Sequence, residues 1–379
     1  MHRFYQNFTL GVLGGGQLGR MLVQSAIDFN LDVNIIDPDE NAPCKNLVSK
    51  FRVGKLTDYQ SVYEFGQACD VLTIEIENVN TDALKQLQKE GKKVFPQPEV
   101  IELIQDKRKQ KQFYLDRGIP TADFILTENR QAVLENRNFL PAVNKLGKEG
   151  YDGRGVQILK NESDLEKAFD APGLLEKLID FEKEISVIVA RNENGEMKAF
   201  PPVELVFNPI HNLVEYLTAP ADISSEVASQ ADAIARKVIN ELDMTGLLAV
   251  EMFVTREGNI LVNEVAPRTH NSGHQTIEAN ITSQFEQHLR AILNMPLGDT
   301  SMKIPSAMVN LLGEDGHTGL AQYEGLEKVL GIKGVHVHLY GKKLTKPFRK
   351  MGHVTIVDQH TESLKEKVKF VKENLKVIA

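Results

Sequence analysis

The sequence predicts an α/β unit at the N-terminus, followed by a larger body of mixed α+β structure. Short apolar strands alternate with helical segments over residues 9–98, an order typical of a parallel sheet with helices on both faces. Further along, the apolar runs "LLAVEMFVT" and "ILVNEVAP" flank a turn signal, which predicts a strand pair. The chain has 379 residues, enough for two or three domains with their own cores.

The N-terminal unit is expected to end near residue 98. Its strands are expected at 10–15, 33–37 and 71–77, and its helices at 18–30, 59–69 and 81–91. Pro96 and Pro98 then mark a boundary, because prolines interrupt regular hydrogen bonding. We therefore expect an N-terminal domain at 1–98, a body at 99–300 and a C-terminal domain at 301–379.

The body is expected to open with one charged helix over 100–118, ended by Gly118. A small section at about 121–184 follows, in which short strands flank a glycine-rich loop. The remaining elements are expected in this order: strands at 184–191 and 197–207, a helix at 224–242, strands at 247–255 and 260–267, several strands after 301, and a final helix at 362–375.

Composition excludes several classes of protein. The chain is 42% hydrophobic and 25% charged, with a net charge of −8, so a broad nucleic-acid-binding surface is not expected. Cys44 and Cys69 cannot build a disulfide framework and suit a reducing compartment. The start lacks an apolar signal core, and no run reaches the roughly 18 apolar residues of a membrane span. We expect a cytoplasmic protein without nucleic-acid or membrane partners.

The first glycine motif leaves open whether the turn binds a dinucleotide or another ligand. Gly14, Gly16 and Gly19 form a GxGxxG turn between a strand and a helix, and Asp37 ends the next strand. This arrangement is typical of dinucleotide-binding proteins, so an NAD-dependent oxidoreductase is one candidate.

A pair of glutamates gives the most informative spacing. If Arg256 to Asn259 form a loop, Thr255 faces Ile260, and Glu251 then lies directly opposite Glu264. Two facing carboxylates repel each other and suit Mg²⁺ held against phosphates. The same strand face continues through Ala266 to Arg268, which adds a cation at one locus, as phosphoryl transfer requires. The alternative is an exposed polar sheet face with solvated glutamates.

A second glycine loop, "KLGKEGYDGRGVQ", combines four glycines with Lys145, Lys148 and Arg154. Such a loop can close its backbone N–H groups on phosphate oxygens, although it is not a Walker loop and a hairpin tip is the alternative. Further on, Glu176 and Glu184 could accept hydrogen bonds from an adenine amine and a ribose, or be ordinary surface glutamates. His336 and His338 are expected on one exposed strand face rather than as a metal pair.

These segments together resemble the ATP-grasp superfamily, and more closely the carboxyaminoimidazole ribonucleotide synthetase family. The resemblance is carried by "GGGQLGRM", "TIEIENV", "GYDGRG", "FEKEISVIVAR", "NEVAPRTHNSGH" and "RKMGHV", which span nearly the whole chain. It implies an ATP-grasp fold with a Rossmann-like N-terminal domain, a small lid and a mixed C-terminal domain. It also implies that the first glycine turn lies at a ribonucleotide substrate rather than at NAD.

The resemblance also implies the site residues. ATP would contact Lys107, Lys145, Gly150, Tyr151, Asp152, Gly153, Arg154, Gly155, Val156, Glu176, Lys177, Leu178, Ile179, Glu184, Phe207, Asn263 and Glu264. The ribonucleotide would contact Gln17, Leu18, Glu77, Tyr151, Arg154, His270, Asn271, Lys342, Arg349 and Lys350. Glu251 and Glu264 would hold Mg²⁺ or Mn²⁺, Arg268 would steady bicarbonate, and Asp152 and His270 are candidate general bases. Lys107 stands where this family usually has arginine, and Phe207 stands where it often has histidine.

The implied reaction is ATP- and bicarbonate-dependent carboxylation of the exocyclic amine of aminoimidazole ribonucleotide, by a homodimer in purine biosynthesis. One alternative within the fold is a formate-dependent glycinamide ribonucleotide transformylase, against which "HNSGH" and "RKMGH" argue. Besides this transformylase and the oxidoreductase, a catalytically silent nucleotide-binding regulator is a third alternative. The intact glutamate pair and Arg268 argue against it.

Overall fold

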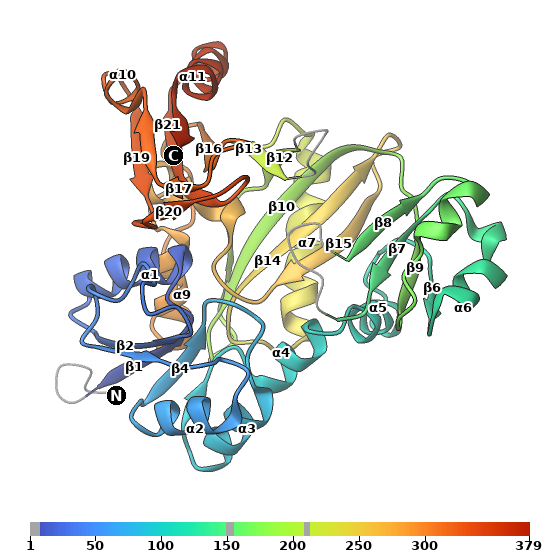
Figure 1. The fold of residues 1–379 in the computed structure, drawn as a ribbon, viewed down its shortest axis with the longest axis horizontal. Coiled ribbons are helices and arrows are strands. Elements are labelled where there is room, and N and C mark those ends of the chain that lie inside the picture. Colours follow the sequence, from blue (N-terminus) through green and yellow to red (C-terminus); the bar gives the residue numbers. More distant parts are fainter. Residues whose placement is uncertain (1–7, 149–154, 208–212) are drawn as a thin grey trace.

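The structure is a computed structural model that describes residues 8–148, 155–207 and 213–379. The N-terminal unit, a small four-stranded sheet and the C-terminal segment form three lobes around the long central strands β10, β14 and β15 (Figure 1), which cover Phe181–Arg191, Gly246–Thr255 and Ile260–Ala266. Among the described residues, no helix is long and apolar enough to cross a bilayer.

The N-terminal unit is a parallel five-stranded sheet in the order β3-β2-β1-β4-β5. Its strands are β1 Thr9–Leu13, β2 Asp32–Asp37, β3 Lys50–Val53, β4 Val71–Ile74 and β5 Lys93–Val94. Helix α1 (Gln17–Asp28) packs on one face, and α2 (Tyr59–Gln67) and α3 (Thr81–Lys89) pack on the other. The predicted parallel sheet is confirmed, whereas the short strands β3 and β5 were not predicted.

The charged segment after the N-terminal unit is two helices, so the prediction of one helix over 100–118 is wrong. Helix α4 covers Pro98–Ile104 and α5 covers Lys107–Asp116. Asp106 separates them, because its backbone is extended and its carboxylate accepts a hydrogen bond from the Arg108 N–H at 3.0 Å. This is the N-cap geometry that begins a new helix.

The small lobe is an antiparallel sheet in the order β6-β9-β7-β8. Its strands are β6 Phe124–Thr127, β7 Ala142–Leu146, β8 Val156–Leu159 and β9 Gly173–Lys177. Helix α6 (Arg130–Glu135) and two 3₁₀ turns, at Arg137–Phe139 and Glu162–Lys167, accompany this sheet. A small core that includes Val133, Leu159 and Leu175 holds the lobe together.

The large sheet runs without interruption from the body into the C-terminal segment. Its order is β15-β14-β10-β12-β13-β16-β21-β19, and β11 adds to β10. Its other strands are β11 Met197–Ala199, β12 Val203–Phe207, β13 Val214–Ala219, β16 Ser306–Leu312, β19 Val335–Leu339 and β21 Lys350–Val357. Two small antiparallel pairs lie beside it: β17 Gly319–Leu320 with β20 Leu344–Thr345, and β18 Gln322–Glu324 with β22 Lys376–Ile378.

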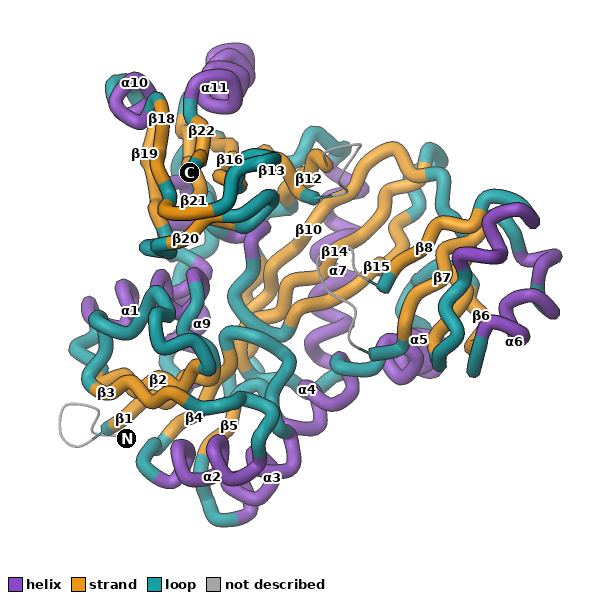
Figure 2. The backbone as a smooth tube through the Cα atoms, in the orientation of Figure 1, coloured by secondary structure: helices purple, strands orange, loops and turns teal. Residues whose placement is uncertain are grey.

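The remaining helices are α7 Ser225–Glu241, α8 Thr276–Ala279, α9 Gln284–Ile292, α10 Leu326–Leu330 and α11 Thr361–Asn374, with a 3₁₀ turn at Asn271–Gly273. Figure 2 shows α11 and α10 beside the C-terminal strands, and α7 across the central ones. The predicted final helix is confirmed, but β22 follows it.

The two faces of β10 and β14 are different in character. Val187 and Val250 point to the face that α7 covers, in the largest apolar core. Their alternating neighbours, such as Ile188 and Ala249, pack with Ala291 of α9. Toward the small sheet this second face becomes polar. The candidate site lies at that polar end.

Candidate active site

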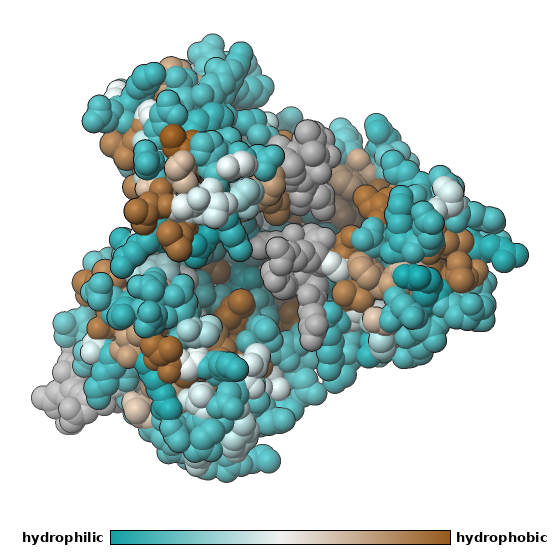
Figure 3. Space-filling view, in the orientation of Figure 1, coloured by the Kyte–Doolittle hydropathy of each residue, from teal (hydrophilic) through white to brown (hydrophobic). Residues whose placement is uncertain are grey.

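A cavity of about 300 Å³ lies where the small sheet meets the polar end of the large sheet. A hollow is visible on this side of the molecule between the lobes (Figure 3). The apolar lining of the cavity is Val143, Val156, Ile158, Leu178, Ile179, Phe181, Leu205, Phe207, Leu213, Val214 and Phe253. Its polar lining is Lys107, Lys145, Glu176, Lys177, Glu184, Glu251, Asn263, Glu264, His270, Asn271, Ser272 and Lys350. An apolar slot beside a charged end suits a ligand with a flat base and a phosphate tail.

Two aromatic residues of the slot were not predicted. Phe181 and Phe253 stack with ring centroids 4.5 Å apart, on the adjacent strands β10 and β14. Phe181 stays 40% exposed, so its ring offers a surface on which a planar ligand can pack. Neither role could be predicted from local pattern, because Phe181 stands among charged residues and Phe253 is an ordinary member of an apolar strand run.

The two glutamates do face each other, but not by the predicted register. Val254, rather than Thr255, pairs with Ile260, so the loop is one residue longer than expected. A bulge at Asn263 compensates, and Glu251 pairs with Glu264. The bulge also turns two successive side chains, Asn263 and Glu264, toward the cavity, whereas the flanking valines face the α7 core.

The charge of this pair is balanced from α5. Lys107 Nζ lies 2.8 Å from Glu264 Oε2. That ammonium lowers the pKa of Glu264 to about 2, although the carboxylate remains 46% exposed to the cavity. Burial, together with the charges of Glu264 and Glu184, raises the pKa of Glu251 well above its usual value. A cation near both carboxylates would reverse that shift.

The chemistry of the pair fits a divalent metal. Glu251 and Glu264 offer hard carboxylate oxygens from adjacent strands to one cavity. In the described part of the chain, no cluster of three or more acidic, histidine or cysteine side chains could hold an ion. The protein therefore offers two carboxylates, as is usual for Mg²⁺ that is also held by substrate phosphates.

Glu176 is paired with two lysines in the structure. Its buried carboxylate lies 3.1 Å from Lys111 Nζ and 3.0 Å from Lys145 Nζ. Burial raises the pKa of Glu176, but the two ammonium groups outweigh it and lower the pKa overall. Lys111 was not predicted, because "DKRKQK" resembles a solvated helix face. Glu176 thus holds two lysines at the cavity edge.

Lys145 connects Glu176 to the bulge at Asn263. Its ammonium donates to Asn263 Oδ1 at 3.1 Å, and Asn263 Nδ2 lies 3.5 Å from Glu184 Oε1. Burial, together with the charge of Glu264, raises the pKa of Glu184 to about 7. The ammonium of Lys177 donates to the Phe139 carbonyl at 3.1 Å.

Part of the predicted ribonucleotide site lies outside this cavity, where the N-terminal unit meets the body. Arg268 Nε lies 3.0 Å from Glu77 Oε1, which links the two parts. Gln17 opens helix α1, and the Leu18 side chain is buried in the core beneath it.

The glycine turn of the N-terminal unit is already occupied by carboxylates of the protein. Asp37 Oδ2 accepts from the Gly15 N–H at 2.7 Å, and Glu75 Oε1 accepts from the Leu18 N–H at 3.1 Å. A side chain at Gly14 or Gly16 would collide with Glu75. Asp37 and Glu75 thus have structural roles, and Glu75 takes up an N–H donor at the start of α1, where a dinucleotide pyrophosphate would bind.

The predicted phosphate cations are near one another but differently placed. Lys350 lines the cavity, and Lys342 Nζ donates to the Lys350 carbonyl at 2.7 Å. Arg349 donates to the Leu344 carbonyl at 2.7 Å. Asn271 also lines the cavity and exchanges side-chain hydrogen bonds with Asn310 at 2.9 and 3.1 Å.

The expectation of one exposed histidine face is wrong for His338. Its ring stacks on His353 at 4.4 Å, and its Nε2 lies 2.8 Å from Glu278 Oε1. His274 packs against His353 at 4.7 Å, and burial lowers the pKa of both His274 and His353.

Residues 149–154 of the second glycine loop, and with them Gly150, Tyr151, Asp152, Gly153 and Arg154, lie outside the described residues. Gly155 has a φ of 77°, which favours glycine.

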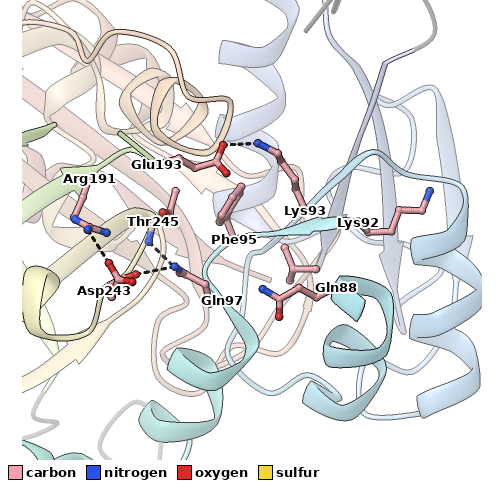
Figure 4. A pocket seen from close by; sticks show the side chains of 10 residues that line it. Gln88, Lys92, Lys93, Phe95, Gln97, Arg191, Glu193, Asp243 and Thr245 are labelled. Atoms are coloured by element: carbon pink, nitrogen blue, oxygen red, sulfur yellow. Dashed lines mark hydrogen bonds and ion pairs between the residues drawn. The ribbon is translucent and has the colours of Figure 1, made fainter. Parts of the chain in front are cut away.

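A second cavity, of about 330 Å³, lies between the N-terminal unit and the body. In Figure 4, Lys93 points to Glu193 and Arg191 points to Asp243, at 2.5 and 2.7 Å, whereas Lys92 points away. The Lys93–Glu193 pair links the N-terminal unit to the body, whereas Arg191 and Asp243 both belong to the body.

Fold and site together define an ATP-grasp protein. Residues 112–285 match the ATP-grasp domain, and residues 8–105 match the ribonucleotide synthetase preATP-grasp domain. Residues 306–367 match the phosphoribosylaminoimidazole carboxylase C-terminal domain.

Individual relatives narrow the class. A crystal structure of N5-carboxyaminoimidazole ribonucleotide synthetase from Thermotoga maritima has a TM-score of 0.91 and 42% identity, and the match covers 98% of this chain and 99% of that one. The N5-carboxyaminoimidazole ribonucleotide synthase of Bacillus subtilis is 36% identical over 94% of this chain and 93% of its own length. The chain belongs to this family. It also spans 65% of the length of the chloroplastic phosphoribosylaminoimidazole carboxylase of Vigna aconitifolia, at 40% identity.

Proposed function

We propose that this protein catalyses the ATP- and bicarbonate-dependent carboxylation of 5-aminoimidazole ribonucleotide, in purine biosynthesis. Bicarbonate attacks the γ-phosphorus of ATP, so ADP leaves and carboxyphosphate forms. The exocyclic amine then attacks the carboxyl carbon, or CO₂ released from it, and phosphate leaves with loss of one amine proton. The product is the N5-carboxy ribonucleotide.

The observation that carries this proposal is the cavity, in which an apolar slot ends at the facing Glu251 and Glu264. The slot fits an adenine base, and Lys107 and Lys145 stand where they can neutralise phosphates. A relative from Aspergillus clavatus, 32% identical, was solved in complex with ADP and 5-aminoimidazole ribonucleotide. By similarity, the ribonucleotide would lie between Lys350, His270 and the Arg268–Glu77 pair.

We propose that Glu251 and Glu264 hold Mg²⁺, with Mn²⁺ as a substitute. When bound, the metal would neutralise charge on the β- and γ-phosphates. The chain itself would orient the reactants and exclude water, because carboxyphosphate hydrolyses readily. From the resemblance to the family, we also propose that the protein is cytoplasmic and that it forms a homodimer. Sedimentation would test the oligomeric state.

The decisive experiment measures ADP release with MgATP, with and without bicarbonate and aminoimidazole ribonucleotide. ADP release that depends on both co-substrates is expected. Release that depends on formate and glycinamide ribonucleotide would instead favour the transformylase alternative.

A further inference from the structure

A buried pair of serines lies behind His270. Ser186 on β10 and Ser272 in the 3₁₀ turn are each 1% exposed, and their hydroxyl oxygens are 2.8 Å apart. Ser272 Oγ is also 2.9 Å from His270 Nδ1. The strand register places Ser186 opposite Glu251, so the serines, the histidine and the glutamate form one group.

The backbone sets the direction of these hydrogen bonds. The Ser272 N–H donates to His270 Nδ1 at 3.3 Å, so Nδ1 is an acceptor. The Ser272 hydroxyl must then donate to the same nitrogen, and the Ser186 hydroxyl can donate to Ser272. Since a neutral imidazole carries one proton, that proton is on Nε2. Nε2 lies 3.6 Å from Glu251 Oε1, at the cavity.

Gln284 fixes the backbone of the same residue. This fully buried side chain accepts from the His270 N–H at 2.9 Å and donates to the His270 carbonyl at 2.7 Å. The two backbone groups determine which end of the amide is which, so the orientation is defined by chemistry. These two hydrogen bonds hold the His270 backbone at a fixed place beside the cavity.

We propose that Ser186, Ser272 and Gln284 are positioning residues that hold His270 as an Nε2–H hydrogen-bond donor to an anionic oxygen in the cavity. This inference rests on the proposed function. In that arrangement His270 stabilises a carboxylate or phosphate oxygen of the reacting group and does not take the proton from the substrate amine.

Substitutions at His270 distinguish a donor from a base. Glutamine places an N–H near the Nε2 position, asparagine places one near Nδ1, and neither is a base. We expect His270→Gln to keep at least about a tenth of the wild-type kcat, and His270→Asn and His270→Ala to lose about 100-fold. If His270→Gln is as inactive as His270→Ala, the proposal is overturned. An inactive wild-type enzyme would instead refute the proposed function.

The serines are tested without relying on turnover. In ¹⁵N-histidine-labelled protein without substrates, we expect a pyridine-type Nδ1 and a pyrrole-type Nε2 for His270, assigned with His270→Gln. Ser272→Ala should shift this Nδ1 signal and lower kcat about tenfold, with a less than twofold change in the KM for ATP. Ser306→Ala, at a buried serine on β16 outside the cavity, is the matched control. A protonated Nδ1 in the wild type, or equal effects of the two serine variants, would overturn the proposal.

Discussion

Replacing Lys111 by methionine should make the protein more stable at pH 7. Lys111 Nζ and Glu176 Oε1 form an ion pair in which both side chains are 3% exposed. Burial lowers the pKa of Lys111 from 10.5 to about 8, and the nearby Glu176 only partly offsets it. The site as a whole therefore disfavours the ammonium, even with its partner present. Methionine has a similar length and leaves Glu176 paired with Lys145.

The magnitude follows from the shift. Lowering the pKa of Lys111 from 10.5 to about 8 corresponds to about 3 kcal/mol against the charged form. Below pH 8 both the folded and unfolded states carry the proton, so the full penalty is present. Between about pH 8 and 10.5 the unfolded state binds more protons, and the stability of the wild type rises with pH. The advantage of Lys111→Met should thus be up to about 3 kcal/mol at pH 7 and should disappear toward pH 10.5.

Urea unfolding followed by circular dichroism, at pH 7 and at steps up to pH 10, measures both effects. Lys109→Met, on the same helix but 55% exposed, is the control and should change the unfolding free energy by less than about 0.5 kcal/mol. If Lys111→Met loses about 2 kcal/mol or more at pH 7, the ammonium is stabilising and the reasoning is refuted. The same variant should weaken ATP binding, since Glu176 at the cavity loses one of its two ammonium partners.

Other predictions concern the ligands. Glu264→Gln should reduce ADP release at least about 100-fold with an unchanged far-ultraviolet spectrum, because the cavity loses half of its carboxylate pair; near-normal turnover would remove the metal role. Lys350→Ala should raise the KM for the ribonucleotide at least about tenfold, whereas a change confined to ATP would contradict its assignment. In a thermal-shift titration MgATP should stabilise the protein, by about 2.7 kcal/mol at a hundredfold excess over Kd, and NAD should not. A shift with NAD and none with MgATP would restore the oxidoreductase.

The glutamate pair shows both the reach and the limit of sequence reasoning. Period-two alternation correctly placed Glu251 opposite Glu264, although the assumed loop began one residue late. The bulge at Asn263 cancelled that error. A bulge leaves no residue-type signal here, so alternation could not predict that both Asn263 and Glu264 face the cavity.

Residues that act across long sequence separations were missed for a common reason. Lys111 meets Glu176, and Ser186 meets Ser272, only after separate lobes or strands have packed. Lys111 stands in a run of charges and Ser186 in an apolar strand, so local pattern assigns each an ordinary role. The contacts of His338 could not be predicted from local pattern, because its partners His353 and Glu278 come from other elements.

The glycine turn shows how one local motif can support two functions. Its glycines allow a close approach to the N-terminus of α1 in either case, so spacing cannot say what approaches. Here the N–H donors of Gly15 and Leu18 are bonded to Asp37 and Glu75. A dinucleotide pyrophosphate would have to displace the Glu75 carboxylate from the Leu18 N–H and leave it facing its own negative charge, whereas an acid at the place of Asp37 is compatible with NAD. A neutral ribose could instead share those carboxylates as hydrogen-bond acceptors. Glu75, rather than the glycines or Asp37, therefore argues against a dinucleotide pyrophosphate at this turn.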